Sequence, residues 1–320
     1  HHNQTRANMI KESVYECIGN TPLVKLQHLP NATNSTKIYG KIEYINPGLS
    51  IKDRAALRLI EDAEKRQLII KGDTIVESTS GNMGHSLAMI CAAKGYKLIC
   101  IVDPKTPKIN IEIYKAYGAS ILLITDMDEY GGYQKNRILT AKKIGEKINH
   151  FNLDQYSNPS CKSGNYNTGY EIFSDLNGKI DVLIASVSTG GHLSGVSKYL
   201  KQHCIKKPIV VGVEPLGSII FGGCQMPYKQ NGTGLSFVPD NYTPSLVDIK
   251  LKCNDNDAFS MCRYIAKNEG ILLGGSSGSV LWAASKLLKS GDIKQDSNIV
   301  CILPDGGIKY IDSIYKEVKS

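Results

Sequence analysis

Short apolar runs rich in β-branched residues recur along the chain, bounded by glycine, proline, aspartate or asparagine. Strands buried on both faces of a sheet have this continuous pattern, whereas half-exposed strands alternate apolar and polar positions. We therefore predict buried strands at residues 74–77, 97–103, 120–124, 181–185, 208–214 and 297–304.

Segments with apolar residues at helical spacing lie between these runs. They predict amphipathic helices at 52–66, 83–94, 110–117, 195–202, 258–268 and 279–289. Strands that alternate with helices form parallel sheets, because the chain must cross over between neighbouring strands. The fold class is therefore α/β, with two lobes of twisted, mostly parallel sheet flanked by helices. The stretch 152–167 has neither pattern and is predicted to be irregular.

Size and charge narrow the class of protein. The 320 residues are 42% hydrophobic and 21% charged, enough for two lobes with a sizeable core. No apolar stretch approaches the roughly 18 residues that a membrane span needs. Residues 1–8 resemble the remnant of an expression tag. The formal charge of +8 is spread without a long basic run, which argues against nucleic acid as a partner and fits small anionic ligands.

The nine cysteines are scattered, and none falls in a CxxC pair or in a Cys/His cluster of zinc spacing. An odd number of dispersed thiols is typical of proteins kept in a reducing compartment. We expect mostly buried, reduced thiols, no metal site and a cytoplasmic location.

Three loops rich in glycine and serine, at 77–84, 186–195 and 272–280, are each expected to connect a strand to a helix. Such loops direct free backbone N–H groups and the positive end of a helix towards an anion. Glycines at these turns are often only structural, but three such loops favour a ligand with a phosphate and a carboxylate.

The common nucleotide motifs are absent. In the second loop Val196 stands where a phosphate-binding P-loop needs lysine, and no loop has the GxGxxG fingerprint of a dinucleotide site. The phosphate is therefore expected to belong to a smaller molecule.

Lys52 lies near the start of a predicted helix, after a turn at Pro47 and Gly48. A lysine there is either a solvated surface residue or an imine-forming amine, and the second role needs a partly buried amine with a lowered pKa.

Several strings, in their order along residues 14–314, resemble the cysteine synthase and cystathionine β-synthase family. These enzymes use pyridoxal 5′-phosphate (PLP) and have fold type II, the fold of the tryptophan synthase β subunit. The strings are IGNTPLVKL at 18–26, KIEYINPGLSIKDR at 41–54, ESTSGN at 77–82, LDQYSNP at 153–159, STGGHLSG at 188–195, GVEPLGS at 212–218, GGSSGS at 274–279 and ILPD at 302–305.

The resemblance implies a domain division and an assembly. We expect a larger PLP-binding domain from residues 9–45 and 153–320, a smaller mobile substrate-binding domain from 46–152, and a homodimer. A cofactor-binding protein without catalytic activity is an alternative of another class, against which the intact Lys52, Asn82 and Ser276 argue.

The resemblance also assigns cofactor contacts. Lys52 would form the internal aldimine, Asn82 would bond the 3′ oxygen of PLP, and Ser276 would face the pyridine nitrogen. A helix N-terminus would hold the phosphate through Ser188, Thr189, Gly190, Gly191 and His192. The family commonly has threonine at position 192, so the histidine is a departure that keeps the backbone donor and changes the side chain.

A hydroxyl at the pyridine nitrogen, unlike a carboxylate, does not hold a proton on the ring, so the ring is a weaker electron sink. This favours rapid loss of a β-substituent over transamination. The expected path is abstraction of the Cα proton by Lys52, loss of the β-substituent to give an α-aminoacrylate, and attack by a nucleophile.

The resemblance places the substrate carboxylate in a pocket formed by Ser78, Thr79, Ser80, Gly81, Asn82 and Gln155. Met83 stands where threonine is common, which indicates a pocket unlike that of an ordinary cysteine synthase. Capping of the helix alone would also account for serines at 78 and 80.

Other strings are similar to siderophore-pathway synthases that join O-phospho-L-serine to L-glutamate, giving N-(2-amino-2-carboxyethyl)-L-glutamate for 2,3-diaminopropionate biosynthesis. They are ESTSGN, VDPK at 102–105, GGYQKNRI at 131–138, VSTGG at 187–191 and GSIIFGG at 217–223. A phosphate leaving group needs a cation and hydroxyl donors, and Arg137, Tyr156 and Ser188 are suitable types. Arg137 could equally lie on the surface, and a cysteine or cystathionine synthase that takes sulfide or homocysteine is the alternative activity.

Overall fold

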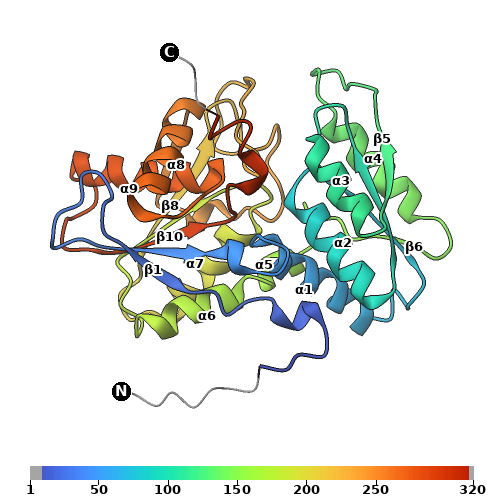
Figure 1. Ribbon diagram of the computed structural model, residues 1–320, viewed down its shortest axis with the longest axis horizontal. Helices are drawn as coiled ribbons and strands as arrows, with labels where there is room; N and C mark the ends of the chain where they lie inside the picture. Colours follow the sequence, from blue (N-terminus) through green and yellow to red (C-terminus); the bar gives the residue numbers. More distant parts are fainter. Residues whose placement is uncertain (1–8, 317–320) are drawn as a thin grey trace.

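The computed structural model describes residues 9–316, and the interpretation of residues 1–8 as a tag remnant lies outside this range. The chain forms two sheets, each flanked by helices, with α1 (Lys52–Lys65) and α5 (Ser160–Ser163) running between them (Figure 1). This confirms the α/β class and the mostly parallel sheets. Within this range no helix is long and apolar enough to span a membrane.

The larger sheet has six strands, and only β1 runs antiparallel to its neighbour. In spatial order they are β1 (Leu23–Leu26), β2 (Lys37–Ile42), β10 (Asn298–Leu303), β7 (Val182–Ser186), β8 (Ile209–Pro215) and β9 (Ile249–Cys253). The smaller sheet is fully parallel, in the order β5 (Ser120–Leu123), β4 (Lys97–Val102), β3 (Thr74–Ser78) and β6 (His150–Asn152).

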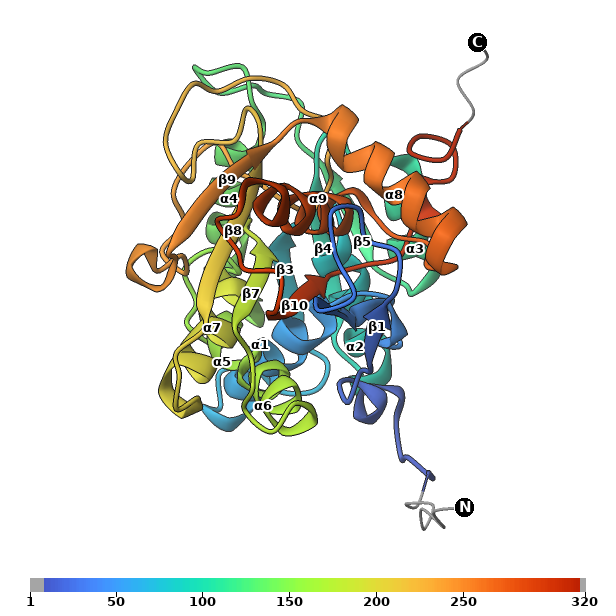
Figure 2. The same ribbon diagram turned by 90° about the vertical axis from the view of Figure 1, so that its left-hand side faces the viewer.

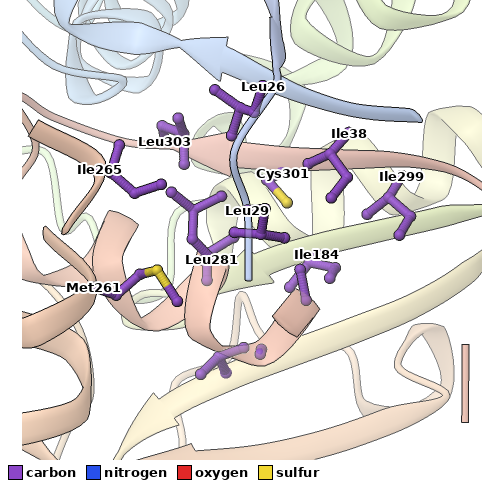
Figure 3. Close-up of a cluster of buried hydrophobic side chains, with 14 of the residues drawn as sticks. Leu26, Leu29, Ile38, Ile184, Met261, Ile265, Leu281, Ile299, Cys301 and Leu303 are labelled. Atoms are coloured by element: carbon purple, nitrogen blue, oxygen red, sulfur yellow. The ribbon is translucent and has the colours of Figure 1, made fainter. Parts of the chain in front are cut away.

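The central strands of the larger sheet are buried on both faces. In β10 the side chains of Ile299, Cys301 and Leu303 pack under α8 (Asp255–Glu269) and α9 (Gly275–Ser290), where Figure 3 shows them around Leu281. The alternate residues Val300 and Ile302 belong to a second cluster with α7 (Gly191–His203) and α6 (Tyr166–Asp175). Because successive side chains of a strand point to opposite faces, a continuous apolar run fills both layers.

Figure 2 shows α8 and α9 on one side of the larger sheet and α5, α6 and α7 on the other. The smaller sheet is covered by α2 (Asn82–Lys94), α3 (Lys108–Ala116) and α4 (Gln134–Gly145). Single 3-10 turns at η1 (Val14–Cys17), η2 (Glu43–Ile45), η3 (Pro244–Leu246) and η4 (Ile308–Tyr310) connect these elements.

All six predicted strands and all six predicted helices are present, with ends shifted by up to four residues. The prediction that 152–167 is irregular was wrong in part, because α5 and the start of α6 lie in it. The third glycine loop was also expected to follow a strand, but it follows α8, and the β pairing in it is an isolated bridge between Leu273 and Gly306.

Candidate active site

A cavity of about 660 Å³ opens between the two sheets, at the carboxyl ends of their strands. In open parallel sheets this edge is the usual place for ligands, because the helix N-termini that follow the strands converge there. The cavity is lined from α1, α2 and α4, from the loops 79–83, 103–107, 130–134 and 188–189, and from the long segment 225–236.

Lys52 is the first residue of α1 and lines this cavity. The turn before it is held by Asp53, whose carboxylate accepts hydrogen bonds from the Gly48 amide at 2.6 Å and from the Ser86 hydroxyl at 2.5 Å. Burial lowers the pKa of Lys52, and its Nζ lies 3.4 Å from Thr189 Oγ1. The structure therefore excludes a solvated surface lysine.

The first turn of α1 is held by buried ion pairs. The Arg54 guanidinium binds Glu43 at 2.5 Å and Glu171 of α6 at 2.7 Å, and Lys41 binds the other oxygen of Glu171 at 2.8 Å. This network ties α1 to β2 and α6, so the helix that carries Lys52 is fixed to the larger sheet.

The loop 188–192 follows β7 and includes the first two residues of α7. Gly190 has a φ of +87°, and a Cβ there would lie 2.5 Å from the Tyr242 backbone nitrogen, so only glycine fits. Ser188 and Thr189 line the main cavity, whereas Gly191 and His192 line a smaller cavity of about 10 Å³ beside Lys52. His192 Nε2 is buried without a partner in the described part of the chain.

Asn82 is the first residue of α2, and its side-chain amide is hydrogen-bonded to residues that follow β10 of the larger sheet. Its Nδ2 donates to Asp305 at 2.9 Å, and its Oδ1 accepts from Lys309 at 3.1 Å. Lys309 Nζ also lies 2.9 Å from His85 Nδ1. Ser276 is buried at the N-terminus of α9, beside the loop that contains Asp305, but it does not line the main cavity. Asp305 thus accepts hydrogen bonds from Asn82 and, through its backbone carbonyl, from Gly274 and Ser277 on either side of Ser276 along the chain.

The residues expected to bind the substrate carboxylate divide into two groups. Thr79, Ser80, Gly81 and Asn82 line the cavity, whereas Ser78 is fully buried and does not. Gln155 and Tyr156, which follow the neighbouring strand β6, also line it, and Gln155 Nε2 donates to the Ser78 carbonyl at 2.9 Å.

Arg137 is only 2% exposed and lines the cavity from α4, so it is not a surface arginine. Its Nε lies 3.2 Å from Asp103 Oδ2, yet neither Nε nor Nη1 has a hydrogen-bond partner of good geometry among residues 9–316. A buried guanidinium with free donors is a binding site for an oxyanion.

Glu77 lies behind the cavity at the end of β3 and was not singled out in the sequence. Burial, followed by the charge of Asp154, raises its pKa to about 8. Its carboxyl group accepts from the Ser78 and Gln155 amides, which connects β3 to the 153–156 segment.

Several lining residues were missed by the sequence analysis. Tyr130, Tyr133, Gln134, Lys105 and the segment 225–236 all face the cavity. The VDPK and GGYQKNRI strings contain Lys105, Tyr133 and Gln134, and Tyr130 directly precedes the second string, but these residues carried no assigned role. The segment 225–236 has no periodic pattern, and only its position beside the cavity identifies it.

The chain is similar to known proteins over most of its length. A family model described as pyridoxal-phosphate dependent enzyme matches residues 14–305. A cysteine synthase from Staphylococcus aureus is 38% identical over 305 residues, which cover 94% of this chain and 96% of that protein.

Two solved structures share the fold over nearly their full length. O-ureido-L-serine synthase matches with a TM-score of 0.90 at 31% identity, covering 97% of each chain. A hydrogen sulfide-producing enzyme from Fusobacterium nucleatum matches with a TM-score of 0.87 at 37% identity, covering 95% of this chain and 99% of the other.

Proposed function

Since this chain belongs to the pyridoxal-phosphate dependent enzyme family, and within it to the PLP-dependent β-replacement enzymes related to cysteine synthase, we propose that O-phospho-L-serine and L-glutamate are its substrates. The product would be N-(2-amino-2-carboxyethyl)-L-glutamate, a precursor of 2,3-diaminopropionate for siderophores. The enzyme would then be a transferase.

The residues present fit the cofactor. The weakly basic, buried amine of Lys52 suits attachment to an aldehyde, and the N-terminus of α7 with the tight turn at Gly190 suits a phosphate. When bound, PLP supplies an electron sink for the negative charge that develops at the substrate Cα.

Each residue then has a role in the proposal. Lys52 holds the cofactor and removes the Cα proton, Asn82 donates to the 3′ oxygen, and the hydroxyl of Ser276 faces the ring nitrogen. The loop 188–192 binds the phosphate. Residues 79–82 and Gln155 bind the substrate carboxylate. The Ser78 carbonyl accepts a hydrogen bond from the Gln155 side chain and so helps to hold it in place.

The observation that carries the choice of phosphoserine is the buried guanidinium of Arg137, which is ion-paired with Asp103 but has no hydrogen-bond partner at Nη1 among residues 9–316. It lines the same cavity as Lys52, Tyr156 and Ser188, so one cation and two hydroxyl groups are available to a leaving phosphate. An acetate leaving group needs less positive charge around it than a phosphate. Sulfide, the nucleophile of a cysteine synthase, needs almost no recognition by side chains.

The size of the cavity supports an amino acid as the nucleophile. A volume of about 660 Å³ is far larger than the space that sulfide requires. Lys105 on its exposed rim adds a cation that suits the second carboxylate of glutamate. A cysteine synthase activity is the second candidate, because a relative of 38% identity bears that name.

We also propose that residues 46–152 form a mobile lobe that closes over the substrate, and that the enzyme is a homodimer. Closure would exclude water from the reacting carbon.

The test supplies O-phospho-L-serine, O-acetyl-L-serine and L-serine separately, each with glutamate, sulfide or homocysteine. Phosphate release and the product mass are measured. We expect turnover with phosphoserine and glutamate. Turnover confined to acetylserine and sulfide would reject the proposed substrates in favour of a cysteine synthase. A protein that stays colourless with PLP would reject the cofactor assignments altogether.

The role of Arg137 is tested separately. Arg137→Ala should raise KM for phosphoserine about 10- to 100-fold, because a charge-assisted hydrogen bond is worth roughly 1.5–3 kcal/mol. Arg137→Lys, which keeps the charge and loses the planar fork, should recover part of this. Lys142→Ala, an exposed cation on the same helix, is the matched control. A KM for phosphoserine that is equal in Arg137→Ala, Arg137→Lys and Lys142→Ala would contradict the assignment.

A further inference from the structure

His192 occupies an unusual position beside the loop 188–192. It lines the cavity of about 10 Å³, which adjoins the main cavity because Lys52 and Thr189 line both. Lys52, Thr189 and Gly191 line the same cavity, so the imidazole lies next to the loop that is proposed to bind the cofactor phosphate.

The tautomer of His192 is fixed by its surroundings. The imidazole donates a hydrogen bond to the Ser186 backbone, and Nε2 is the nitrogen that has no partner among the described residues. Nδ1 is therefore the donor and Nε2 carries a lone pair. Burial, together with the nearby charge of Lys52, lowers the pKa of His192 to about 3, so the imidazole is neutral before a ligand binds.

We propose that His192 binds the cofactor phosphate through Nε2, and that the imidazole and the phosphate share one proton taken up from solvent when the cofactor binds. This inference rests on the proposed function. A phosphate dianion repels a lone pair, so one of the two partners must carry a proton. A phosphate monoester has its second pKa near 6, so the phosphate can take up this proton and donate it to the neutral Nε2 of His192.

The other groups that line this cavity do not supply the proton shared between the imidazole and the phosphate. Lys52 enters from α1 and is committed to the cofactor aldehyde in the proposed function. Cys161 enters from α5, and burial raises the pKa of its thiol to about 12, so it stays neutral. Asn165 and Thr189 are uncharged. Among these side chains, His192 is thus the one that offers an unpartnered nitrogen lone pair to a protonated phosphate.

The experiment measures PLP binding to the full chain freed of cofactor, at pH 6.5, 7.5 and 8.5. Wild type is compared with His192→Thr and His192→Gln. Above pH 7 the wild-type affinity should fall about tenfold per pH unit relative to His192→Thr, because each bound cofactor takes up one extra proton. Calorimetry in two buffers of different ionisation enthalpy counts this proton directly. Proton changes caused by reaction with Lys52 are common to all forms and cancel in the comparison.

Pyridoxal, which lacks the phosphate, is the matched ligand control, and its affinity should respond equally to pH in all three proteins. Equal pH slopes for PLP in wild type and His192→Thr, or an equal proton count, would overturn the proposal. That result would leave the proposed function intact provided that PLP binds. Failure of wild type to bind PLP at all would instead remove the proposed function.

Discussion

Buried polar atoms without a hydrogen-bond partner gather around the cavity. In residues 9–316 they belong to Glu77, Ser78, Asn110, Arg137, His192, Gln230 and Tyr242. Gln230 and Arg137 line the cavity, Asn110 donates to the Ser80 carbonyl on its wall, and Tyr242 packs on Gly190. Since folded proteins pair nearly all buried polar groups, this concentration marks the place where a ligand completes the hydrogen bonding.

Glu77 gives the clearest prediction at this scale. Its pKa is raised by burial from 4.5 to about 8, so the folded protein keeps a proton that the unfolded chain loses. The contribution of Glu77 to the free energy of unfolding should therefore be greatest below pH 4.5 and should fall as the pH rises to about 8. The slope is at most about 1.4 kcal/mol per pH unit.

Glu77→Gln removes this dependence, because the amide cannot ionise. Urea unfolding of wild type and variant at pH 5, 6.5 and 8 measures it, with Glu129→Gln on the exposed surface as control. Parallel curves for wild type and Glu77→Gln would show that the carboxyl group titrates normally.

At the scale of elements, Lys52 is positioned by α1, whose first turn is held by ion pairs in addition to the apolar packing of the helix. Partial burial raises the pKa of Glu171, but the hydrogen bond and charge of Arg54 outweigh it and lower this pKa to about 2. Glu171 is therefore charged at neutral pH and pairs with Arg54 and with Lys41, whose side chain is fully buried.

Glu171→Ala should cost about 3 kcal/mol, because removing one partner leaves a buried cation unpaired. Glu129→Ala, which breaks an exposed pair with Lys135, should cost about 0.5 kcal/mol or less. Urea unfolding at pH 7 compares the two variants. A loss at Glu171 no larger than that at Glu129 would mean that the network does not hold α1.

At the scale of the whole molecule, the cavity is bounded by both sheets and closed at its mouth by long loops. Ser236 donates to Gln134 Oε1 at 3.1 Å, which connects the segment 225–236 to α4. Residues of both segments 128–136 and 225–236 line the cavity, so these segments are the parts expected to respond to binding.

We expect slower amide hydrogen exchange in 128–136 and 225–236 when phosphoserine is added to the enzyme with its cofactor. The buried strand β7 serves as the internal reference, since its exchange should not change. Unchanged exchange in both loop segments, at a concentration that supports turnover, would argue against closure.

The sequence by itself determined the central strands and most helices, because continuous apolar runs and helical periodicity depend on local spacing. It also located the three loops rich in glycine and serine, whose defining residues lie close together along the chain. It missed β1, β2, β6 and β9, which are short or lie towards the edges of the sheets and contain lysine, glycine or asparagine. Such strands depend on their neighbours more than on their own pattern.

Only the tertiary structure decided which side chains share the cavity. Arg137 could have pointed to solvent from α4, and nothing local distinguishes a buried from an exposed arginine on a helix. Its burial, the pKa of Glu77 and the free nitrogen of His192 arise from elements far apart in the sequence. Charge and hydrogen bonding depend on distance in space, and only the packing of the two sheets around the cavity sets that distance.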